Sequence, residues 1–366
     1  MCVIIIYMKN LNLLIKPCSS LCNLNCEYCF YLDECENRKI HSYGVMSDIT
    51  LENLIKNALL TSGKSCSFAF QGGEPTLCGI DFYKKAIDLQ RQYNLNNVKI
   101  TNTIQTNGSL INEEWAAFFA ENHFLVGISL DGTREAHNKY RRDKNGGGSW
   151  DRALHGADLL KDAGAEYNVL CVINAANAKN GALVYNTLKK HKYLQFIPCI
   201  DPEGDKKRAF SLSDRKYTEF LNAIFPLYYN DLQNGVDVSV RLFDNFIDII
   251  RGNPPEMCGM SGRCVCYGVV EADGSVFPCD FYAYDEYFLG NINEMSLTDI
   301  LTSDKSKQFI KSSVLPDECR ACGYKKLCGG GCRRERYDNG KYKYCQSIKA
   351  FLSKNYTALY ELAAKF

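Results

Sequence analysis

Three cysteines in a C-x3-C-x2-C arrangement, Cys22, Cys26 and Cys29, constrain this chain more than any other feature. A structural zinc site or a fully ligated iron–sulfur centre needs a fourth ligand, for which Cys18 and Cys35 are candidates. Three thiolates on a four-iron cluster would instead leave one iron with an open position. Because catalytic metal sites keep an open position and structural ones do not, the spacing favours a catalytic cluster. A zinc knuckle is the alternative.

The composition is that of a globular protein with an unusual number of thiols. The 366 residues are 46% hydrophobic and 23% charged, which suggests one large domain or a large one with a smaller one. The net charge of +1 predicts no general attraction to nucleic acid or to an anionic membrane. Nineteen cysteines would suit a secreted disulfide framework, but the number is odd and no signal peptide or membrane span is visible. We therefore expect reduced, metal-binding cysteines in an anaerobic cytoplasm, and a translation start at Met1 or Met8.

Residues 11–200 are predicted to alternate between strands and helices. The predicted strands are residues 11–15, 67–70, 98–104, 124–130, 167–173 and 194–197. The predicted helices between them are one capped by Asp48 or Thr50, one at 81–93, one capped by Asn112 that runs to 122, and those at 149–163 and 180–191. Six such alternations predict a parallel sheet with right-handed crossovers. The active site of such a sheet lies at the carboxyl ends of its strands, where the distinctive residues of this chain occur.

The last third of the chain has a different composition. Residues 214–251 are predicted to be helical, and from Cys258 onward the chain is rich in cysteine, glycine and turns. Residues 269–277 predict a hairpin around Asp273-Gly274, and residues 347–364 predict a final helix. We expect a domain of residues 8–212, a helical connector of 213–257 and a cysteine-rich domain of 258–366.

Two motifs in the first domain carry a resemblance. The C-x3-C-x2-C motif, with an aromatic residue before its last cysteine, resembles the signature of the radical S-adenosylmethionine (SAM) superfamily. Gln71-Gly72-Gly73-Glu74-Pro75 resembles the Gly-Gly-Glu-Pro motif of the same superfamily. The resemblance implies an α/β fold, a partial (β/α)6 TIM-like barrel, whose [4Fe–4S] cluster binds SAM at the open iron. The implied SAM contacts are Tyr28, Gly72, Gly73, Glu74, Ser129, Arg141 and Ile200. For the last three, a strand-end hydroxyl, a surface arginine and a core isoleucine are the ordinary alternatives.

The cysteines of the second domain carry another resemblance. Their spacing, Cys264-x9-Gly274-x4-Cys279 followed by Cys319-x2-Cys322-x5-Cys328-x3-Cys332 and Cys345, resembles the seven-cysteine SPASM pattern, and Cys258 adds an eighth thiol. Eight thiolates suit two fully ligated auxiliary [4Fe–4S] clusters, and a pair of zinc ribbons is the alternative. The resemblance assigns one cluster to Cys258, Cys264, Cys279 and Cys332, and the other to Cys319, Cys322, Cys328 and Cys345. Cys266 is unassigned. The remaining cysteines are interpreted as buried or spare thiols: Cys2, Cys18, Cys35, Cys66, Cys78, Cys171 and Cys199.

Nearly the whole chain resembles the anaerobic sulfatase-maturating enzymes. The supporting segments, besides the motifs above, are Cys29-Phe30-Tyr31, Gln105-Thr106-Asn107-Gly108, Leu194-Gln195-Phe196-Ile197, Cys279-Asp280-Phe281-Tyr282 and Gly330-Gly331-Cys332-Arg333-Arg334. The resemblance implies a radical SAM oxidoreductase that converts a cysteine or serine of a sulfatase to Cα-formylglycine. In the implied mechanism a deoxyadenosyl radical takes a hydrogen atom from Cβ, Asp280 takes the thiol or hydroxyl proton, and an auxiliary cluster takes the remaining electron. A carboxylate beside aromatic walls and a cluster ligand suits a general base.

The same resemblance implies partners. They are an unfolded sulfatase or peptide and a low-potential electron donor such as flavodoxin or ferredoxin, and we expect a cytoplasmic monomer without nucleic-acid or membrane partners. The alternative function is a radical SAM/SPASM maturase of a ribosomally made peptide, which forms a thioether or carbon–carbon crosslink. The open cluster position and the glycine turn argue against a non-enzymatic electron carrier or zinc-binding module. Arg333, Arg334 and Arg336 are expected to offset the charge of a nearby cluster. Residues 143–149 and 202–210 match no motif and are candidates for substrate choice.

Overall fold

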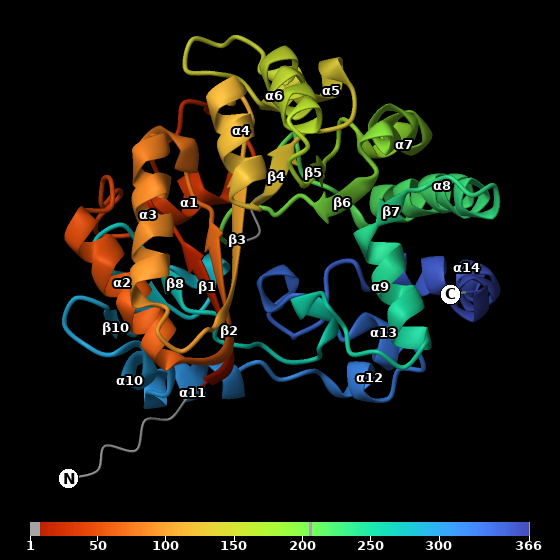
Figure 1. The fold of residues 1–366 in the computed structure, drawn as a ribbon. Coiled ribbons are helices and arrows are strands. Elements are labelled where there is room, and N and C mark those ends of the chain that lie inside the picture. Colours follow the sequence, from red (N-terminus) through yellow and green to blue (C-terminus); the bar gives the residue numbers. More distant parts are fainter. Residues whose placement is uncertain (1–7, 205–206, 366) are drawn as a thin grey trace.

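Six parallel strands form the centre of the molecule in a computed structural model that describes residues 8–204 and 207–365. Their order in the sheet follows the chain, with Ile15 beside Phe70 and Phe70 beside Ile104. The strands are β1 (Met8–Ile15), β2 (Ser62–Phe70), β3 (Lys99–Thr106), β4 (Leu125–Ser129), β5 (Tyr167–Ile173) and β6 (Tyr193–Pro198). Figure 1 shows the larger helices outside this curved sheet. This arrangement confirms the predicted partial (β/α)6 barrel. Met1, one of the two predicted translation starts, and the predicted spare thiol Cys2 lie outside the described residues.

The helices between the strands occur where the apolar periodicity predicts them. They are α2 (Asp48–Thr61), α3 (Ile80–Tyr93), α4 (Glu113–Glu121), α6 (Trp150–Asp162) and α7 (Gly181–Leu188). Asn112 caps α4 as predicted, because its side chain accepts a hydrogen bond from the Trp115 N–H at 3.0 Å. The predicted cap of α2 is wrong: Ser47 accepts from the Thr50 N–H at 3.1 Å. Two short helices, α1 (Phe30–Glu36) and α5 (Arg134–Tyr140), were not predicted.

An aromatic core packs the helices onto the sheet. Phe70 on β2 contacts Tyr83 of α3, with 5.1 Å between ring centroids, and Phe124 lies 5.3 Å from Phe119 of α4. All four side chains are almost fully buried. Because each buried aromatic side chain contributes about 1.5–3 kcal/mol through burial, this layer holds the strand ends in fixed positions.

The predicted helical connector is interrupted. Helix α8 (Asp214–Gln233) ends before Gly235, whose φ of 74° reverses the chain, and the short strand β7 (Ser239–Val240) pairs with β6 before α9 (Arg241–Ile250) begins. The prediction of one helical stretch over 214–251 is therefore wrong in its middle. Helix α14 (Cys345–Lys365) packs on α8 and α9, where Phe225, Phe243 and Phe351 lie 5.0–5.2 Å apart.

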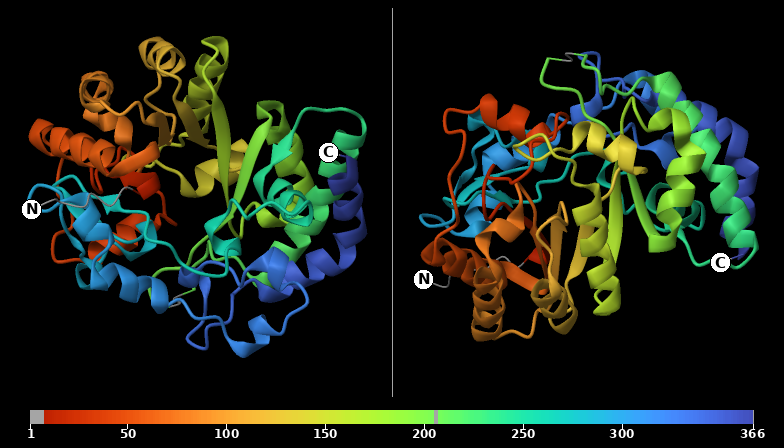
Figure 2. Two further views of the ribbon diagram at one scale, coloured as in Figure 1. Left: turned by 60° about the horizontal axis from the view of Figure 1, so that its bottom comes forward. Right: turned by 90° about the horizontal axis from the view of Figure 1, so that it is seen from above.

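The cysteine-rich domain extends the sheet of the barrel. Strand β8 (Val269–Val270) pairs parallel to β1, and the Asp273-Gly274 turn leads back into the antiparallel strand β9 (Ser275–Phe277), which confirms the predicted hairpin. Strand β10 (Gly290–Asn291) completes the edge. The short helices that follow are α10 (Leu297–Leu301), α11 (Asp304–Lys311), α12 (Asp317–Arg320) and α13 (Lys325–Cys328). Figure 2 shows this domain, in blue, reaching from the β1 edge to α14. Among the described residues, no helix is both long and apolar enough to span a membrane.

Candidate active site

The loop with the three cysteines leaves the carboxyl end of β1 and enters α1. Its course is fixed from the opposite side of the barrel, because the Asn25 N–H donates to the Arg142 carbonyl at 2.7 Å and the Glu27 N–H to the Tyr140 carbonyl at 3.0 Å. Within the loop, the Leu24 N–H donates to Cys22 Sγ at 3.4 Å. The loop therefore reaches across the open ends of the strands.

The three thiols form one group. Burial raises the pKa of Cys22 to about 11 and that of Cys26 to about 12, and the neighbouring Cys29 contributes to both. Cys18 and Cys35 have other partners: Cys18 lies 3.8 Å from the Pro75 carbonyl oxygen, and Arg38 donates to Cys35 Sγ at 3.0 Å. The structure thus groups the three predicted ligands.

The thiols are not gathered around the position of a single metal ion. Among the described residues, no three His, Cys, Asp or Glu side chains converge closely enough to bind one metal ion. Tetrahedral zinc with bonds of about 2.3 Å requires thiolates about 3.8 Å apart, whereas a four-iron cluster fills the space between its thiolates.

The glycine motif closes against the cysteine loop. Gly73 has a φ of 55°, and a Cβ at this position would lie 2.1 Å from the Leu21 carbonyl oxygen. Gly72 has a φ of 124°, and its Cβ would lie 2.7 Å from Cγ of Lys16. Only glycine permits both the backbone conformation and this close approach. Packing against Lys16 and the cysteine loop therefore explains why both positions are glycine, independently of any contact with a ligand.

Glu74 of the same motif is a buried bridge between two strand ends. Its Oε1 accepts hydrogen bonds from the Thr76 N–H and hydroxyl and from the Thr106 hydroxyl at 2.6–3.1 Å, and its Oε2 accepts from the Asn107 N–H at 2.8 Å. Asn107 in turn donates to the Asn23 side chain at 2.8 Å. The contact of Glu74 with SAM stays a prediction, and its role in the structure is to align the cluster loop with β3.

Asp131, which sequence reasoning missed, brings two predicted SAM contacts together. This buried carboxylate accepts from Arg141 Nε at 2.9 Å and from the Tyr28 hydroxyl, and its other oxygen accepts from the Val172 N–H at 2.9 Å. The Arg141 guanidinium lies 5.4 Å from the centroid of the Tyr28 ring. Arg141 is therefore a buried, paired cation and not a surface arginine. The only sign of Asp131 in the sequence is the Asp-Gly pair after the fourth predicted strand.

The other predicted SAM contacts lie on the same ends of the strands. Ser129 is buried at the end of β4 and accepts from Gln105 Nε2 at 3.2 Å. Ile200 is half-buried just beyond β6. The structure thus places the seven predicted positions on the loops that follow β1, β2 and β6, at the end of β4 and directly after α5.

His137 supports this arrangement as a neutral side chain. Its Nδ1 accepts from the Asp131 N–H at 3.2 Å, so its proton is on Nε2, which donates to the Ser149 hydroxyl at 2.9 Å. Ser149 donates onward to the Arg141 carbonyl at 2.9 Å. Burial lowers the pKa of His137 to about 4. The imidazole therefore fixes the backbone around Asp131 and Arg141 without carrying charge.

Eight of the nine cysteines of the second domain fall into two groups, as predicted. Burial, with contributions from Glu335, Cys258 and Cys264, raises the pKa of Cys332 to about 12. Burial also raises the pKa of Cys279, and Cys332 and Cys258 contribute to this. In the second group, burial raises the pKa of Cys328 to about 11, with a contribution from three thiols. Those three are Cys319, Cys322 and Cys345, and together with Cys328 they line a single hollow. Cys266 belongs to neither group.

Two of the three arginines that are expected to offset a cluster charge contact the backbone or aromatic rings near Cys332. Arg336 donates to the Gly330 and Gly331 carbonyls at 3.0 and 2.8 Å, and Arg333 lies over the rings of Tyr282 and Phe309. Both arginines thus hold the backbone around Cys332 in place. Their effect on the potential of a cluster stays a prediction.

Asp280, the predicted base, sits where the two domains meet. It begins a short 3-10 helix (Asp280–Tyr282) directly after Cys279. Its Oδ1 accepts from the Tyr31 hydroxyl at 2.5 Å and lies 3.3 Å from the Lys16 ammonium, and its Oδ2 accepts from Gln71 Nε2 at 3.1 Å. The side chain keeps 12% of its surface exposed. The carboxylate is therefore oriented by all three motif regions and remains accessible to a small group.

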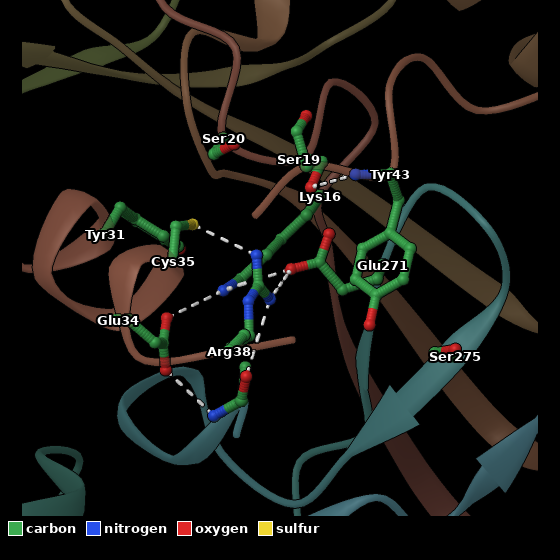
Figure 3. A network of polar contacts seen from close by, with 12 residues as sticks. Lys16, Ser19, Ser20, Tyr31, Glu34, Cys35, Arg38, Tyr43, Glu271 and Ser275 are labelled. Carbon is green, nitrogen blue, oxygen red and sulfur yellow. Dashed lines mark hydrogen bonds and ion pairs between the residues drawn. The ribbon is translucent and has the colours of Figure 1, made fainter. Parts of the chain in front are cut away.

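A buried charge network beneath Asp280 was not predicted (Figure 3). Lys16 Nζ lies 3.3 Å from Glu34 and 3.8 Å from Glu271, and Arg38 pairs with Glu271 at 2.6 Å. Burial alone would lower the pKa of Lys16, but Glu34, Asp280 and Glu271 raise it above its ordinary value. The one signal in the sequence was a lysine at the carboxyl end of an apolar strand. The network joins β1, α1 and the β8–β9 turn.

Comparisons with known proteins agree with this geometry. Residues 17–177 match the model of the radical SAM superfamily, and residues 258–323 match that of SPASM, an iron–sulfur cluster-binding domain. The fold and the cysteine groups thus define a radical SAM protein with a SPASM domain.

Individual relatives identify the family within this class. A cysteine-type anaerobic sulfatase-maturating enzyme from Clostridium novyi is 46% identical, covering 96% of this chain and 97% of that one. A serine-type enzyme from Bacteroides thetaiotaomicron is 33% identical over 94% of this chain and 91% of its own. The solved structure described as native anSMEcpe with bound AdoMet and Cp18Cys peptide superposes with a TM-score of 0.91 at 44% identity, covering 97% of this chain and 99% of that one. This chain belongs to the anaerobic sulfatase-maturating enzymes.

Proposed function

We propose that this protein oxidises a cysteine of a sulfatase to Cα-formylglycine. The observation that carries the proposal is Asp280, a partly accessible carboxylate held between the glycine motif and the cysteine-rich domain. The greater identity to a cysteine-type relative than to a serine-type relative favours cysteine as the substrate residue. Relatives with these names act on sulfatases, which supports a sulfatase over the precursor peptide of the alternative function.

The cysteine groups are the proposed cofactor ligands. Cys22, Cys26 and Cys29 would hold a [4Fe–4S] cluster with an open iron, and the two groups of four would hold auxiliary [4Fe–4S] clusters. When bound at that iron, SAM supplies the chemistry that removes a hydrogen atom from the substrate Cβ. Tyr28, Arg141 and the other predicted positions would bind it. We also propose the domain boundaries at residues 8–212, 213–257 and 258–366.

The two oxygens of Asp280 have different roles in this proposal. Oδ1 faces two donors, Tyr31 and Lys16, whereas among the described residues Oδ2 accepts only from Gln71. A carboxylate oxygen offers two lone pairs, so Oδ2 keeps one for a substrate proton. An ionised carboxylate is the form of this side chain that accepts a proton. Oδ2 is therefore the proposed acceptor of the substrate thiol proton.

Removal of a hydrogen atom and a proton from the cysteine leaves one electron to be accepted. Loss of that electron gives a thioaldehyde, which water hydrolyses to formylglycine with release of hydrogen sulfide. The acceptor must lie close to the substrate, and Cys279, a proposed ligand of an auxiliary cluster, is the residue before Asp280. The proposed partners are an unfolded sulfatase segment and a low-potential donor such as flavodoxin or ferredoxin. We propose that the enzyme acts as a monomer in the cytoplasm, without nucleic acid or membrane.

The test is an anaerobic assay of the protein reconstituted with iron and sulfide. The protein, SAM and dithionite are mixed with a Cys-x-Pro-x-Arg peptide, and the aldehyde is captured with a hydroxylamine reagent. The expected result is an aldehyde in the cysteine peptide, formed faster than in the matched serine peptide. SAM cleavage without an aldehyde in either peptide, together with a crosslink in a precursor peptide, would establish the alternative function instead.

A further inference from the structure

The buried ammonium of Lys16 joins the barrel to the base, and we propose that Lys16 is the positioning residue for Asp280. The inference rests on the proposed role of Asp280 as the proton acceptor. Lys16 directly follows β1, and its Nζ lies 3.3 Å from Asp280 Oδ1. The strand that leads into the first cysteine loop therefore also holds a carboxylate that comes from the other domain.

Three carboxylates set the position of the ammonium, and Figure 3 shows two of them, Glu34 and Glu271. Its three N–H groups face Glu34, Glu271 and Asp280 at 3.3–3.8 Å, which matches the number of donors that a lysine has. Two of these carboxylates are anchored independently, because Glu34 accepts from the Ala283 N–H at 2.8 Å and Glu271 pairs with Arg38 at 2.6 Å. Asp280 is the third carboxylate, so the fixed pair determines where it is held.

The stem of Lys16 is confined as well. It runs beneath Gly72, where a Cβ would lie 2.7 Å from Lys16 Cγ, so the first glycine of the motif makes room for this side chain. Its Nζ also lies 4.1 Å from the centroid of the Tyr31 ring, and the Tyr31 hydroxyl donates to the same Oδ1. Lys16 and Tyr31 thus hold Oδ1 together, which leaves Oδ2 to accept from Gln71.

The test must separate positioning from folding. With every group ionised, the network has two cations, Lys16 and Arg38, and three anions, Glu34, Glu271 and Asp280, which gives a net charge of −1. Lys16→Met alone makes this −2 in a buried place and is expected to destabilise the fold. The double variant Lys16→Met/Glu34→Gln restores −1, and glutamine keeps a side-chain oxygen for the Ala283 N–H. Only the contact between Lys16 and Asp280 is then lost without compensation.

The experiment compares the reconstituted double variant with wild type. Iron content, thermal unfolding and 5′-deoxyadenosine formation are measured beside the kcat and KM for formylglycine in the Cys-x-Pro-x-Arg peptide. We expect wild-type iron, unfolding and deoxyadenosine, an unchanged KM, and a kcat for formylglycine lower by about 10- to 100-fold, the usual effect of a displaced catalytic group. Lys189→Met, which breaks the 2.9 Å pair with Asp231 outside the site, is the control and should keep the wild-type ratio of formylglycine to deoxyadenosine.

Two results would overturn the proposal. A wild-type ratio of formylglycine to deoxyadenosine in the double variant, with Asp280→Asn impaired in the same assay, would leave the proposed function standing and reduce Lys16 to a structural residue. A wild-type ratio in Asp280→Asn itself would remove the base, and with it both the proposed function of Asp280 and the role of Lys16.

Discussion

Replacement of Asp280 by asparagine is expected to separate radical formation from substrate oxidation. The fold should tolerate the change, because the buried network then has two cations and two anions and no unpaired charge. An amide oxygen still accepts from Tyr31 and faces Lys16, so the shape of the site is kept. What is lost is the free lone pair of Oδ2, which an amide NH2 group cannot offer.

The size of the effect follows from this loss. A missing general base costs about two to four orders of magnitude in rate, or about 3–5 kcal/mol in the barrier. Formylglycine formation on the cysteine peptide should fall by that factor, whereas 5′-deoxyadenosine should still form, because the proposed SAM contacts lie on the barrel. Both products are quantified by mass spectrometry in one reaction. Aldehyde formation at the wild-type rate would refute the reasoning, and so would a parallel loss of both products.

Two further predictions concern the metal and the pH dependence. The reconstituted protein should bind roughly twelve irons, and the triple replacement of Cys22, Cys26 and Cys29 by alanine should remove about a third of them and stop SAM cleavage; full iron retention would contradict the ligand assignment. The pKa of His137, lowered to about 4, means that between pH 6.5 and 4 the unfolded chain binds a proton that the folded chain does not. Stability should therefore fall by about 2 kcal/mol from pH 7 to 5 through this residue, and urea unfolding of His137→Gln should show a correspondingly shallower pH dependence than wild type. Equal pH dependence in both proteins would contradict a buried neutral imidazole.

The barrel could be predicted from the sequence because its signals are local. Each strand is a short apolar run followed by a turn, and each helix shows a clear apolar period. The order and the type of these elements could therefore be predicted directly. Errors arose where several residues of equal propensity compete. Ser47, Asp48 and Thr50 are all good N-cap residues, and only the structure identifies Ser47 as the cap. The break at Gly235 was missed because apolar residues continue on both sides of it.

The candidate site could be predicted only in part, for a different physical reason. The residues of the cysteine motif lie close together in the sequence, and so do those of the glycine motif, so both motifs could be identified. Asp131 and Lys16 act through partners far away in the sequence. Lys16 lies beside Glu271 because the two-residue strand β8 pairs with β1. A strand of two residues has no sequence pattern that predicts which strand it pairs with. Buried ion pairs of this kind depend on the tertiary fold and leave no periodic pattern.

The central claim, that this protein removes a hydrogen atom from Cβ of a cysteine to make formylglycine, is tested most directly by isotope transfer. A Cys-x-Pro-x-Arg peptide with both Cβ hydrogens replaced by deuterium is incubated with wild-type protein, SAM and dithionite, and the deuterium in 5′-deoxyadenosine is measured beside the aldehyde. The account predicts one deuterium transferred to deoxyadenosine for each formylglycine formed. Formylglycine without deuterium in deoxyadenosine, or deuterated deoxyadenosine with a crosslinked peptide and no aldehyde, would contradict it.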